Sequence, residues 1–489
     1  MVLRRRFRFN MHIWKSVSKS WYICQVWNFS IISVLALTIS NILLTIRLLH
    51  KPDCPNVVDT KIAPVAITRF PAPLHPDIVI SSSDCGGGGD DNTIDEFAEL
   101  GNHSHRLVFD RLNLLRGRWD ASRQYKYFDF AAVGNRYDDL TKKYKVCLAT
   151  QSSLERLYSL VSVASHWTGP ISLAVYVAGD DELYLLQLYL SYLQNCFASI
   201  RDAVTIHLAY PIKRAPKTVR KFLKSDYSNF VCDQPELTLK KLMKFRTTET
   251  IKWRLKNAYP QNHLRNLARK GCQNDYIFLT DIDIIPSINF TDNLDKFLRK
   301  SQCSSQSKCA YVVPTYEIDN RAKFPQTKAD LLRLSKRGLA RPFHHKVFIY
   351  NQYATNFSRW ESNVGSPQDD TTISHNVTNF EFLYEPFYVS TDSVPPHDER
   401  FLGYGFTRNT QVYEMFVAGY QFHVLTPIFT CHWGLQNKKS RPAWRERQNN
   451  LNRKQFEVFK KEIYARYHRD PLQMLQPKKA PEIKPKVKP

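Results

Sequence analysis

The chain has 489 residues, of which 43% are hydrophobic and 23% are charged, and its formal net charge is +24 at pH 7. The apolar content excludes a chain that is disordered throughout, and the length suffices for one large domain or two ordinary ones. The basic excess favours an anionic ligand, which leaves open a nucleic acid, a nucleotide-sugar or an acidic glycan.

The N-terminal region predicts a membrane anchor. Residues 1–20 carry six basic residues and no acid, and no charged residue lies between Lys19 and Arg47. Such a stretch is long enough to span a bilayer, for which about 20 residues suffice as a helix. The positive-inside rule then predicts a cytosolic tail at 1–20, a signal anchor at 21–46 and a lumenal body. A cleaved signal peptide is the alternative, and the length of the stretch disfavours it.

Sequons and cysteines support a lumenal body. Nine of the ten cysteines lie outside the anchor, so at least one of them is free or pairs between chains. Cys303 and Cys309 flank a polar loop and are candidates for a small disulfide in an oxidising compartment. Four N-x-Ser/Thr sequons follow the anchor, at Asn102, Asn289, Asn356 and Asn376.

Two segments are predicted to be flexible spacers rather than parts of a packed domain. Residues 47–142 are predicted to form a stem, because they hold clustered prolines and the run DCGGGGDD at 84–91. Aromatic residues in the later part of this stem are expected to pack on the following domain. The Pro- and Lys-rich tail at 471–489 is predicted to be disordered.

Residues 143–470 are predicted to form one α/β domain. Apolar strands alternate with helical segments, which indicates a mainly parallel sheet with helices on both faces. Ligands of such sheets bind beyond the carboxyl ends of the strands. The clearest strands are VCLAT (146–150), ISLAVYV (171–177), VTIHLAY (204–210) and YIFLT (276–280).

The fourth strand leads into a candidate metal site. It ends in Asp281-Ile282-Asp283, and residues i and i+2 of a strand point to the same face. Both carboxylates can therefore converge on one cation, and hard oxygen ligands suit Mn²⁺ or Mg²⁺, which commonly bridge protein and diphosphate. A solvated turn is the alternative for an isolated Asp-x-Asp.

The segment before this strand predicts a basic helix. In NHLRNLARKG, Leu264, Leu267 and Ala268 form an apolar face, and Gly271 is the expected helix stop. Arg265 and Arg269 lie one turn apart on another face. They are placed to neutralise a metal-bound diphosphate, with a solvated basic face as the alternative.

Two later segments carry candidate catalytic or ligand residues. Asp398 and Glu399 precede a Gly-punctuated aromatic loop, and either carboxylate can act as a general base; the alternative is an ion pair with Arg400. His432 ends an apolar strand that can return to the two aspartates, where a neutral imidazole would complete the metal ligands. His423 is a weaker candidate.

Several motifs together resemble one known family. They are CLATQSS, YP-x-NHLRN-x-A, FLTDIDI-x-P, YEPF, PP-x-DERF-x-GYGF and the closing KKEIYARY, in this order between about 145 and 467. The set resembles the β-1,4-glucuronyltransferases of the matriglycan (α-dystroglycan) pathway, to which the second catalytic domain of the LARGE glycosyltransferases is related.

The resemblance implies a GT-A fold, Mn²⁺ as cofactor, UDP-glucuronic acid as donor and inversion at the anomeric carbon. The implied acceptor is a xylose-terminated O-mannosyl glycan on a glycoprotein, and the implied location is the Golgi membrane, single-pass type II with a lumenal catalytic domain. The motif positions would make Asp281, Asp283 and His432 the metal ligands. The same motif positions would place five residues beside the uridine or the rest of the donor: Thr150, Gln151, Ser152, Arg265 and Asn266.

Departures from the family pattern keep other functions open. HWGLQNKK after the last strand and the stem have their own sequence, which leaves other acceptors open. The same fold can use UDP-xylose or UDP-N-acetylglucosamine as donor, because fold does not fix function. A non-catalytic lectin or an assembly partner of other glycosyltransferases would keep the fold and the anchor. A nucleic-acid enzyme is disfavoured, because lumenal proteins seldom meet nucleic acid.

Overall fold

The computed structural model describes residues 38, 108–109, 112–219, 230–301, 308–362, 370–437 and 442–475. All of them except Thr38 belong to one compact unit, Glu96–Pro489. The predicted cytosolic tail, almost all of the anchor, most of the stem and the end of the basic tail lie outside the described residues. Within the described part of the chain, no helix is both long and apolar enough to cross a membrane.

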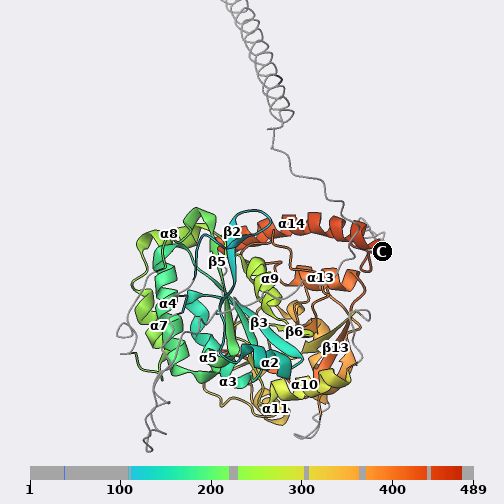
Figure 1. The fold of residues 1–489 in the computed structure, drawn as a ribbon. Helices are drawn as coiled ribbons and strands as arrows, with labels where there is room; N and C mark the ends of the chain where they lie inside the picture. Colours follow the sequence, from blue (N-terminus) through green and yellow to red (C-terminus); the bar gives the residue numbers. More distant parts are fainter. Residues whose placement is uncertain are drawn as a thin grey trace, which may run out of the picture. The chain divides into compact units, whose positions relative to one another are not determined.

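A ten-stranded mixed sheet organises this unit (Figure 1). From edge to edge its strands are β1 (Arg118–Trp119), β2 (Tyr125–Ala132), β5 (Val204–Pro211), β4 (Ile171–Tyr176), β3 (Val146–Ser153), β6 (Tyr276–Leu279), β12 (Phe387–Thr391), β8 (Cys309–Val313), β13 (Gln421–Thr426) and β11 (Thr372–Asn376). The four predicted strands are confirmed as β3, β4, β5 and β6, which are mutually parallel.

The sheet departs from the expected mainly parallel form on both sides of this centre. β2 pairs antiparallel with β5, and β12 runs antiparallel between β6 and β8. β2 falls in the segment predicted as stem, so the folded unit begins before residue 143. Its side chains Tyr125, Tyr127 and Phe128 are buried, which explains why this aromatic-rich segment joins the sheet.

A second, four-stranded sheet and the helices complete the unit. This sheet has the order β10 (Ala340–Pro342), β9 (Thr315–Ile318), β14 (Thr430–Trp433) and β7 (Ile285–Pro286). The helices are α2 (Tyr137–Lys143), η1 (Leu154–Ser159), α3 (Leu160–His166), α4 (Gly179–Cys196), α5 (Ala198–Ala203), η2 (Ile212–Arg214), α7 (Pro235–Met243), α8 (Thr248–Lys256), α9 (Gln261–Gly271), α10 (Phe290–Lys300), α11 (Lys328–Lys336), η3 (Ile349–Asn351), η4 (Tyr353–Thr355), α12 (Phe357–Ser362), α13 (Asn409–Val417) and α14 (Ala443–Tyr467).

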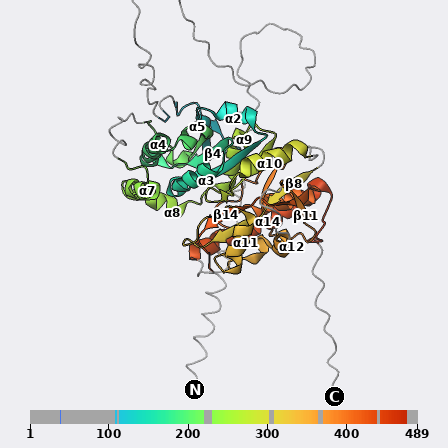
Figure 2. The same ribbon diagram turned by 90° about the horizontal axis from the view of Figure 1, so that it is seen from below.

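The two faces of the parallel strands bury different cores. Val146 and Leu148 of β3 point to a large core that they share with α3, α4, α5 and α10. Ala149, one residue on, points to the opposite face, where Leu264 and Leu267 of α9 cover the sheet. This alternation follows from the two-residue period of a strand, and it places α9 against the face opposite to α3 and α4 (Figure 2).

The C-terminal end of α9 is fixed tightly to the sheet. The predicted stop at Gly271 is confirmed, and a Cβ there would lie 2.1 Å from Nε2 of His207 and 2.4 Å from Oγ of Ser172. Only a residue without a side chain fits so close an approach. The next residue, Cys272, forms a disulfide with Cys147 of β3.

The remaining cysteines agree with an oxidised chain. Cys196 and Cys232 form a second disulfide, and Cys309 is also disulfide-bonded. Cys303, its expected partner, lies outside the described residues. Among the described residues Cys431 is a free, buried thiol, in agreement with the odd number of cysteines beyond the anchor.

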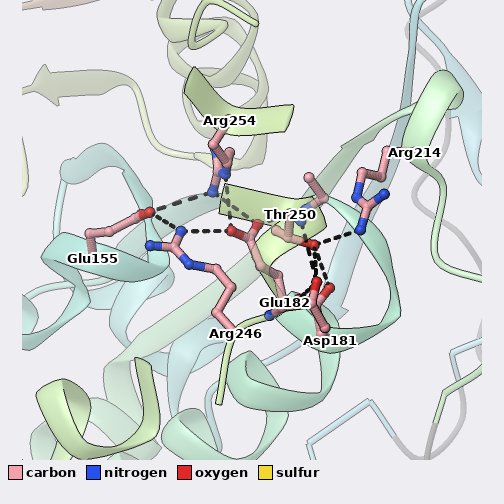
Figure 3. A network of polar contacts seen from close by, with 9 residues as sticks. Glu155, Asp181, Glu182, Arg214, Arg246, Thr250 and Arg254 are labelled. Carbon is pink, nitrogen blue, oxygen red and sulfur yellow. Dashed lines mark hydrogen bonds and ion pairs between the residues drawn. The ribbon is translucent and has the colours of Figure 1, made fainter. Parts of the chain in front are cut away.

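A buried ion-pair network holds α8 and the loop before it against α4 (Figure 3). Glu182 is fully buried in the first turn of α4, and Arg246 and Arg254 each donate to its carboxylate at 3.0 Å. The same two guanidiniums face Glu155; burial alone would raise the pKa of Glu155, and Arg254 together with local hydrogen bonds lowers it to about 2. The Glu155 carboxylate therefore stays ionised at neutral pH.

This network predicts a large stability loss for Glu182→Gln. The substitution leaves two buried guanidiniums with too little negative charge, so we expect the free energy of unfolding to fall by about 3 kcal/mol. Urea unfolding followed by circular dichroism measures it. Glu249→Gln is the matched control, because Glu249 is 82% exposed and lies 3.7 Å from Arg214; its loss should stay below about 1 kcal/mol. Equal losses in the two variants would contradict the assignment.

Candidate functional site

A cavity of ≈ 550 Å³ lies at the carboxyl ends of β3 and β6. Gln151 and Ser152 at the end of β3, and Asp281 and Asp283 after β6, contribute to its lining. This is the position at which α/β sheets bind ligands, because the loops that follow parallel strands gather there. Five arginines also line it, which makes the cavity suitable for an anion: Arg156, Arg265, Arg408, Arg445 and Arg453.

The two aspartates lie in a turn between β6 and β7 rather than on the strand itself. The backbone N–H of Ile284 donates to the carbonyl of Asp281 at 3.1 Å and closes this turn. Ile282 between them is 4% exposed and packs into the core, as the alternation predicts. Asp281 and Asp283 nevertheless line the same cavity, so the expectation that they face one space holds in the turn.

His432 of β14 reaches the same aspartates from the second sheet. Its Nε2 lies 3.5 Å from Oδ2 of Asp283, and its buried Nδ1 has no hydrogen-bond partner. A smaller cavity of ≈ 210 Å³ is lined by both aspartates and by this imidazole. Two carboxylates and an imidazole with an unused nitrogen form a donor set that fits a divalent cation.

Two arginines neutralise Asp281. Nη2 of Arg408 lies 2.5 Å from Oδ1 of Asp281, and Nη2 of Arg265 lies 3.4 Å from the same oxygen. Burial alone would raise the pKa of Asp281, but Arg408 and Arg265 lower it below its ordinary value. The carboxylate is therefore ionised at neutral pH, and its guanidinium partners stand where anionic oxygens of a ligand would meet the cation.

The residues predicted to lie beside a nucleotide divide into two groups. Gln151, Ser152 and Arg265 line the large cavity, and Oε1 of Gln151 accepts a hydrogen bond from the Tyr259 hydroxyl at 2.5 Å. Thr150 is fully buried and is not part of the lining. Asn266 points away from the cavity, because its Nδ2 donates to the carbonyl of His397 and to Oε1 of Glu399.

Asp398 and Glu399 lie at a different cavity, also of ≈ 550 Å³. Asp398 is held by Arg400, whose Nε lies 3.0 Å from each carboxylate oxygen, and Arg400 also pairs with Glu462 of α14. This is the ion pair that the sequence left as the alternative. Neither acid lines the cavity of Asp281 and Asp283, so the structure does not bring them together with the metal-ligand candidates.

Glu385 is a further carboxylate that the sequence reading did not single out. Asp281 and Asp283 line two cavities, and among the described residues Glu385 is the one further acid that lines both of them. Nδ2 of Asn351 donates to Oε2 of Glu385 at 2.8 Å, and burial raises the pKa of Glu385 above its ordinary value. In the sequence, Glu385 stands out only as part of the YEPF stretch, which by itself indicates no catalytic or ligand role.

Arg408 and His344 are two further lining residues that sequence reasoning missed. Arg408 follows the Gly-rich loop after Glu399, and its guanidinium carbon lies 4.3 Å from the ring centroid of Phe387. His344 faces both aspartates, and burial, with His432 nearby, lowers its pKa to about 4. Neither residue stands in a pattern that a single sequence makes visible.

Comparison with known proteins identifies a matching family. A family model described as "Glycosyl-transferase for dystroglycan" matches residues 145–468. Beta-1,4-glucuronyltransferase 1 of Homo sapiens is 30% identical over 331 residues, which cover 67% of this chain and 77% of that protein. The Danio rerio protein of the same name is 29% identical over 368 residues, with coverages of 73% and 83%.

More distant similarities extend to two other proteins. Xylosyl- and glucuronyltransferase LARGE1 of Homo sapiens is 27% identical over 322 residues, which cover 65% of this chain and 34% of that protein. A crystal structure of GalNAc-T7 with UDP, GalNAc and Mn²⁺ aligns with 66% of this chain and 50% of that chain, with a TM-score of 0.34 and 8% identity. The last similarity is too low to carry an argument.

The family model covers more than half of the chain, and the relatives near 30% identity are also named as glycosyltransferases, namely glucuronyltransferases. The sequence resemblance is thereby confirmed. The chain is a glycosyltransferase that belongs to the family described as "Glycosyl-transferase for dystroglycan".

Proposed function

We propose that this glycosyltransferase has a GT-A fold and transfers glucuronic acid from UDP-glucuronic acid to a xylose-terminated glycan, with inversion and with Mn²⁺ as cofactor. The observation that carries the proposal is the position of Asp281 and Asp283, which line both the arginine-lined cavity at the carboxyl ends of β3 and β6 and the smaller cavity that His432 reaches. The relatives named as glucuronyltransferases support the choice of donor.

Asp281, Asp283 and His432 would hold the cation. A bound Mn²⁺ would supply a Lewis acid that stabilises the charge of the departing UDP. Arg265 and Arg408 stand beside Asp281 and would contact diphosphate oxygens. Gln151 and Ser152 would lie by the uridine, where Tyr259 already fixes the Gln151 side chain.

The carboxylate of the donor sugar explains the further basic residues of the cavity. Arg156, Arg445 and Arg453 line it but do not contact Asp281 or Asp283 through any ion pair among the described residues. A UDP-sugar with an acidic sugar carries one more negative charge than a neutral one. Arginines beyond those required for the diphosphate are therefore suited to glucuronic acid.

Glu385 is our proposed general base. An inverting transfer needs one group to take the proton from the acceptor hydroxyl while the donor bond breaks on the opposite face of the sugar. Glu385 lines the same cavity as the metal-ligand candidates, and its raised pKa favours proton uptake. Asp398 and Glu399 remain the alternative, which requires the acceptor to reach their separate cavity.

The cellular location is also part of the proposal. A chain with two described disulfides and a fifth disulfide-bonded cysteine, Cys309, suits an oxidising compartment. Together with the sequons and the basic N-terminus, this supports a type II Golgi membrane protein with a cytosolic tail at 1–20, an anchor at 21–46 and a lumenal body.

A second donor is the specific alternative. One relative is named as both a xylosyl- and a glucuronyltransferase, so UDP-xylose is the first competitor, and UDP-N-acetylglucosamine the next. A lectin or an assembly partner of other glycosyltransferases would retain the cavity without turnover. One assay separates these possibilities.

We expect UDP release from UDP-glucuronic acid with a xyloside acceptor to depend on Mn²⁺. Asp283→Asn should lower kcat/KM by at least about 100-fold, because it removes an anionic ligand of the cation that stabilises the leaving group. A panel of UDP-sugars, assayed with Mn²⁺ and with chelator, measures this. Asp275→Asn, at an exposed acid before β6, is the control. Turnover of another donor would overturn the sugar assignment, and no turnover by folded protein would favour the lectin.

Glu385→Gln should lower kcat about 100-fold or more, because a carboxamide cannot take the acceptor proton. Affinity for UDP with Mn²⁺, measured by calorimetry, should stay within about threefold, since the amide keeps the shape and the contact with Asn351. Asp398→Asn is assayed beside it. If Asp398→Asn loses kcat while Glu385→Gln does not, the base lies at the second cavity.

A further inference from the structure

A second cluster of ligand-type side chains lies at the cavity of Asp398. Asp120 comes from the turn between β1 and β2, His263 from α9, and Glu399 from the loop that precedes α13. One ligand atom from each lies within 4.8 Å of the other two. Three segments that are far apart in the sequence therefore meet at one point, away from Asp281 and Asp283.

The geometry of the cluster is centred on the imidazole. Nε2 of His263 lies 3.8 Å from Oδ2 of Asp120 and 3.8 Å from Oε2 of Glu399. Asp120 is 5% exposed and His263 is 4% exposed, whereas the Glu399 side chain is 30% exposed and borders the cavity. Two carboxylate oxygens thus flank one nitrogen at distances slightly longer than hydrogen bonds.

Neither ring nitrogen of His263 forms a hydrogen bond with any residue that the structure describes. Nδ1 is buried without a partner, and Nε2 stands between the two carboxylates beyond hydrogen-bond distance. A buried polar group without a partner is costly, and native proteins rarely leave one. The orphaned atom is Nδ1; the other ring nitrogen, Nε2, faces the two carboxylates and is placed as a metal ligand would be.

The carboxylates lack a cation of their own. Among the described residues, neither Asp120 nor Glu399 has a Lys or Arg nitrogen within 4.0 Å, and Arg400 is taken by Asp398 and Glu462. Two neighbouring carboxylates in a partly buried site repel each other unless positive charge stands between them. A divalent cation would supply that charge.

We propose that Asp120, His263 and Glu399 bind a Zn²⁺ ion, at a site separate from the donor site and independent of the proposed reaction. One imidazole and two carboxylates suit Zn²⁺, which such a set binds more tightly than the Mn²⁺ proposed for the like set at Asp281, Asp283 and His432, whereas Ca²⁺ and Mg²⁺ prefer more oxygen ligands and no nitrogen. The open side, toward the cavity, leaves room for a water as fourth ligand.

Surrounding hydrogen bonds already orient the carboxylates. The backbone N–H of Tyr125 donates to Oδ1 of Asp120 at 2.6 Å, and Nδ2 of Asn266 donates to Oε1 of Glu399 at 3.0 Å. Oδ2 of Asp120, which faces His263, also accepts hydrogen bonds from the backbone N–H and the hydroxyl of Ser122, so both carboxylates are held in place by neighbours, as supporting residues hold metal ligands. The ion would tie the β1–β2 turn and the 395–406 loop to α9.

The test uses the full-length protein in detergent, in the Asp283→Asn background that removes the donor-site cation. After chelation and dialysis against Zn²⁺, we expect about one Zn²⁺ per chain by mass spectrometry. We also expect a rise in Tm of about 5 °C at Zn²⁺ near 100 times Kd. Glu399→Gln and His263→Gln should each abolish both effects. Lys270→Gln, which borders the same cavity, is the matched control and should keep them.

Each outcome decides the proposal. Absence of Zn²⁺ and of the Tm rise in the Asp283→Asn background would show that the cluster is a histidine–carboxylate contact without metal. Retention of Zn²⁺ by both ligand variants would place the ion elsewhere. Glu399→Gln keeps the volume of the side chain and the contact with Asn266. Its circular dichroism spectrum therefore separates loss of metal from loss of fold if His263→Gln does not fold.

Discussion

The close approach of α9 to the sheet is the constraint on which the rest of the site depends. Ala149, Ala174 and Ala268 lie in the contact, and at Gly271 no side chain fits beneath His207. Small residues let the helix lie near β3 and β4, and the Cys147–Cys272 bond joins its end to the sheet. Because α9 is fixed in this way, Arg265 reaches Asp281, while His263, two residues earlier, reaches the second cavity.

Charge is distributed around α9 according to the same geometry. At the first cavity, the guanidiniums of Arg265 and Arg408 both contact Asp281, which is ionised. The same two cations are available to the oxygens of a diphosphate. At the second cavity, Arg400 pairs with both Asp398 and Glu462, and in the described part of the chain no Lys or Arg nitrogen lies within 4.0 Å of Asp120 or Glu399. Asp398 and Arg408, at the two ends of one loop, therefore lie in different electrostatic environments, Asp398 at the second cavity and Arg408 at the first.

Local patterns made part of this structure predictable from sequence. The four central strands, the apolar face of α9, its stop at Gly271 and the paired aspartates all depend on spacing within about ten residues. The position of β12, the role of Arg408 and the entry of Glu385 into the cavity depend on contacts across more than a hundred residues, which a single sequence does not reveal. The sequence could not separate the two interpretations of Asp398, because an acid paired with Arg400 leaves the same sequence signal as a catalytic acid.

The Cys147–Cys272 bond has a consequence for how the protein can be produced. It closes a loop with a sequence separation of 125 residues, and chain-entropy estimates for such loops give about 5 kcal/mol of stabilisation. In a reducing cytosol this bond would not form, and the contact between β3 and α9 would lose its stabilisation. These two elements carry Gln151 and Arg265. Recombinant expression through an oxidising secretory route should therefore yield folded protein, whereas expression in a cytosolic host should yield chains in which the cavity wall at Gln151 and Arg265 is loosened.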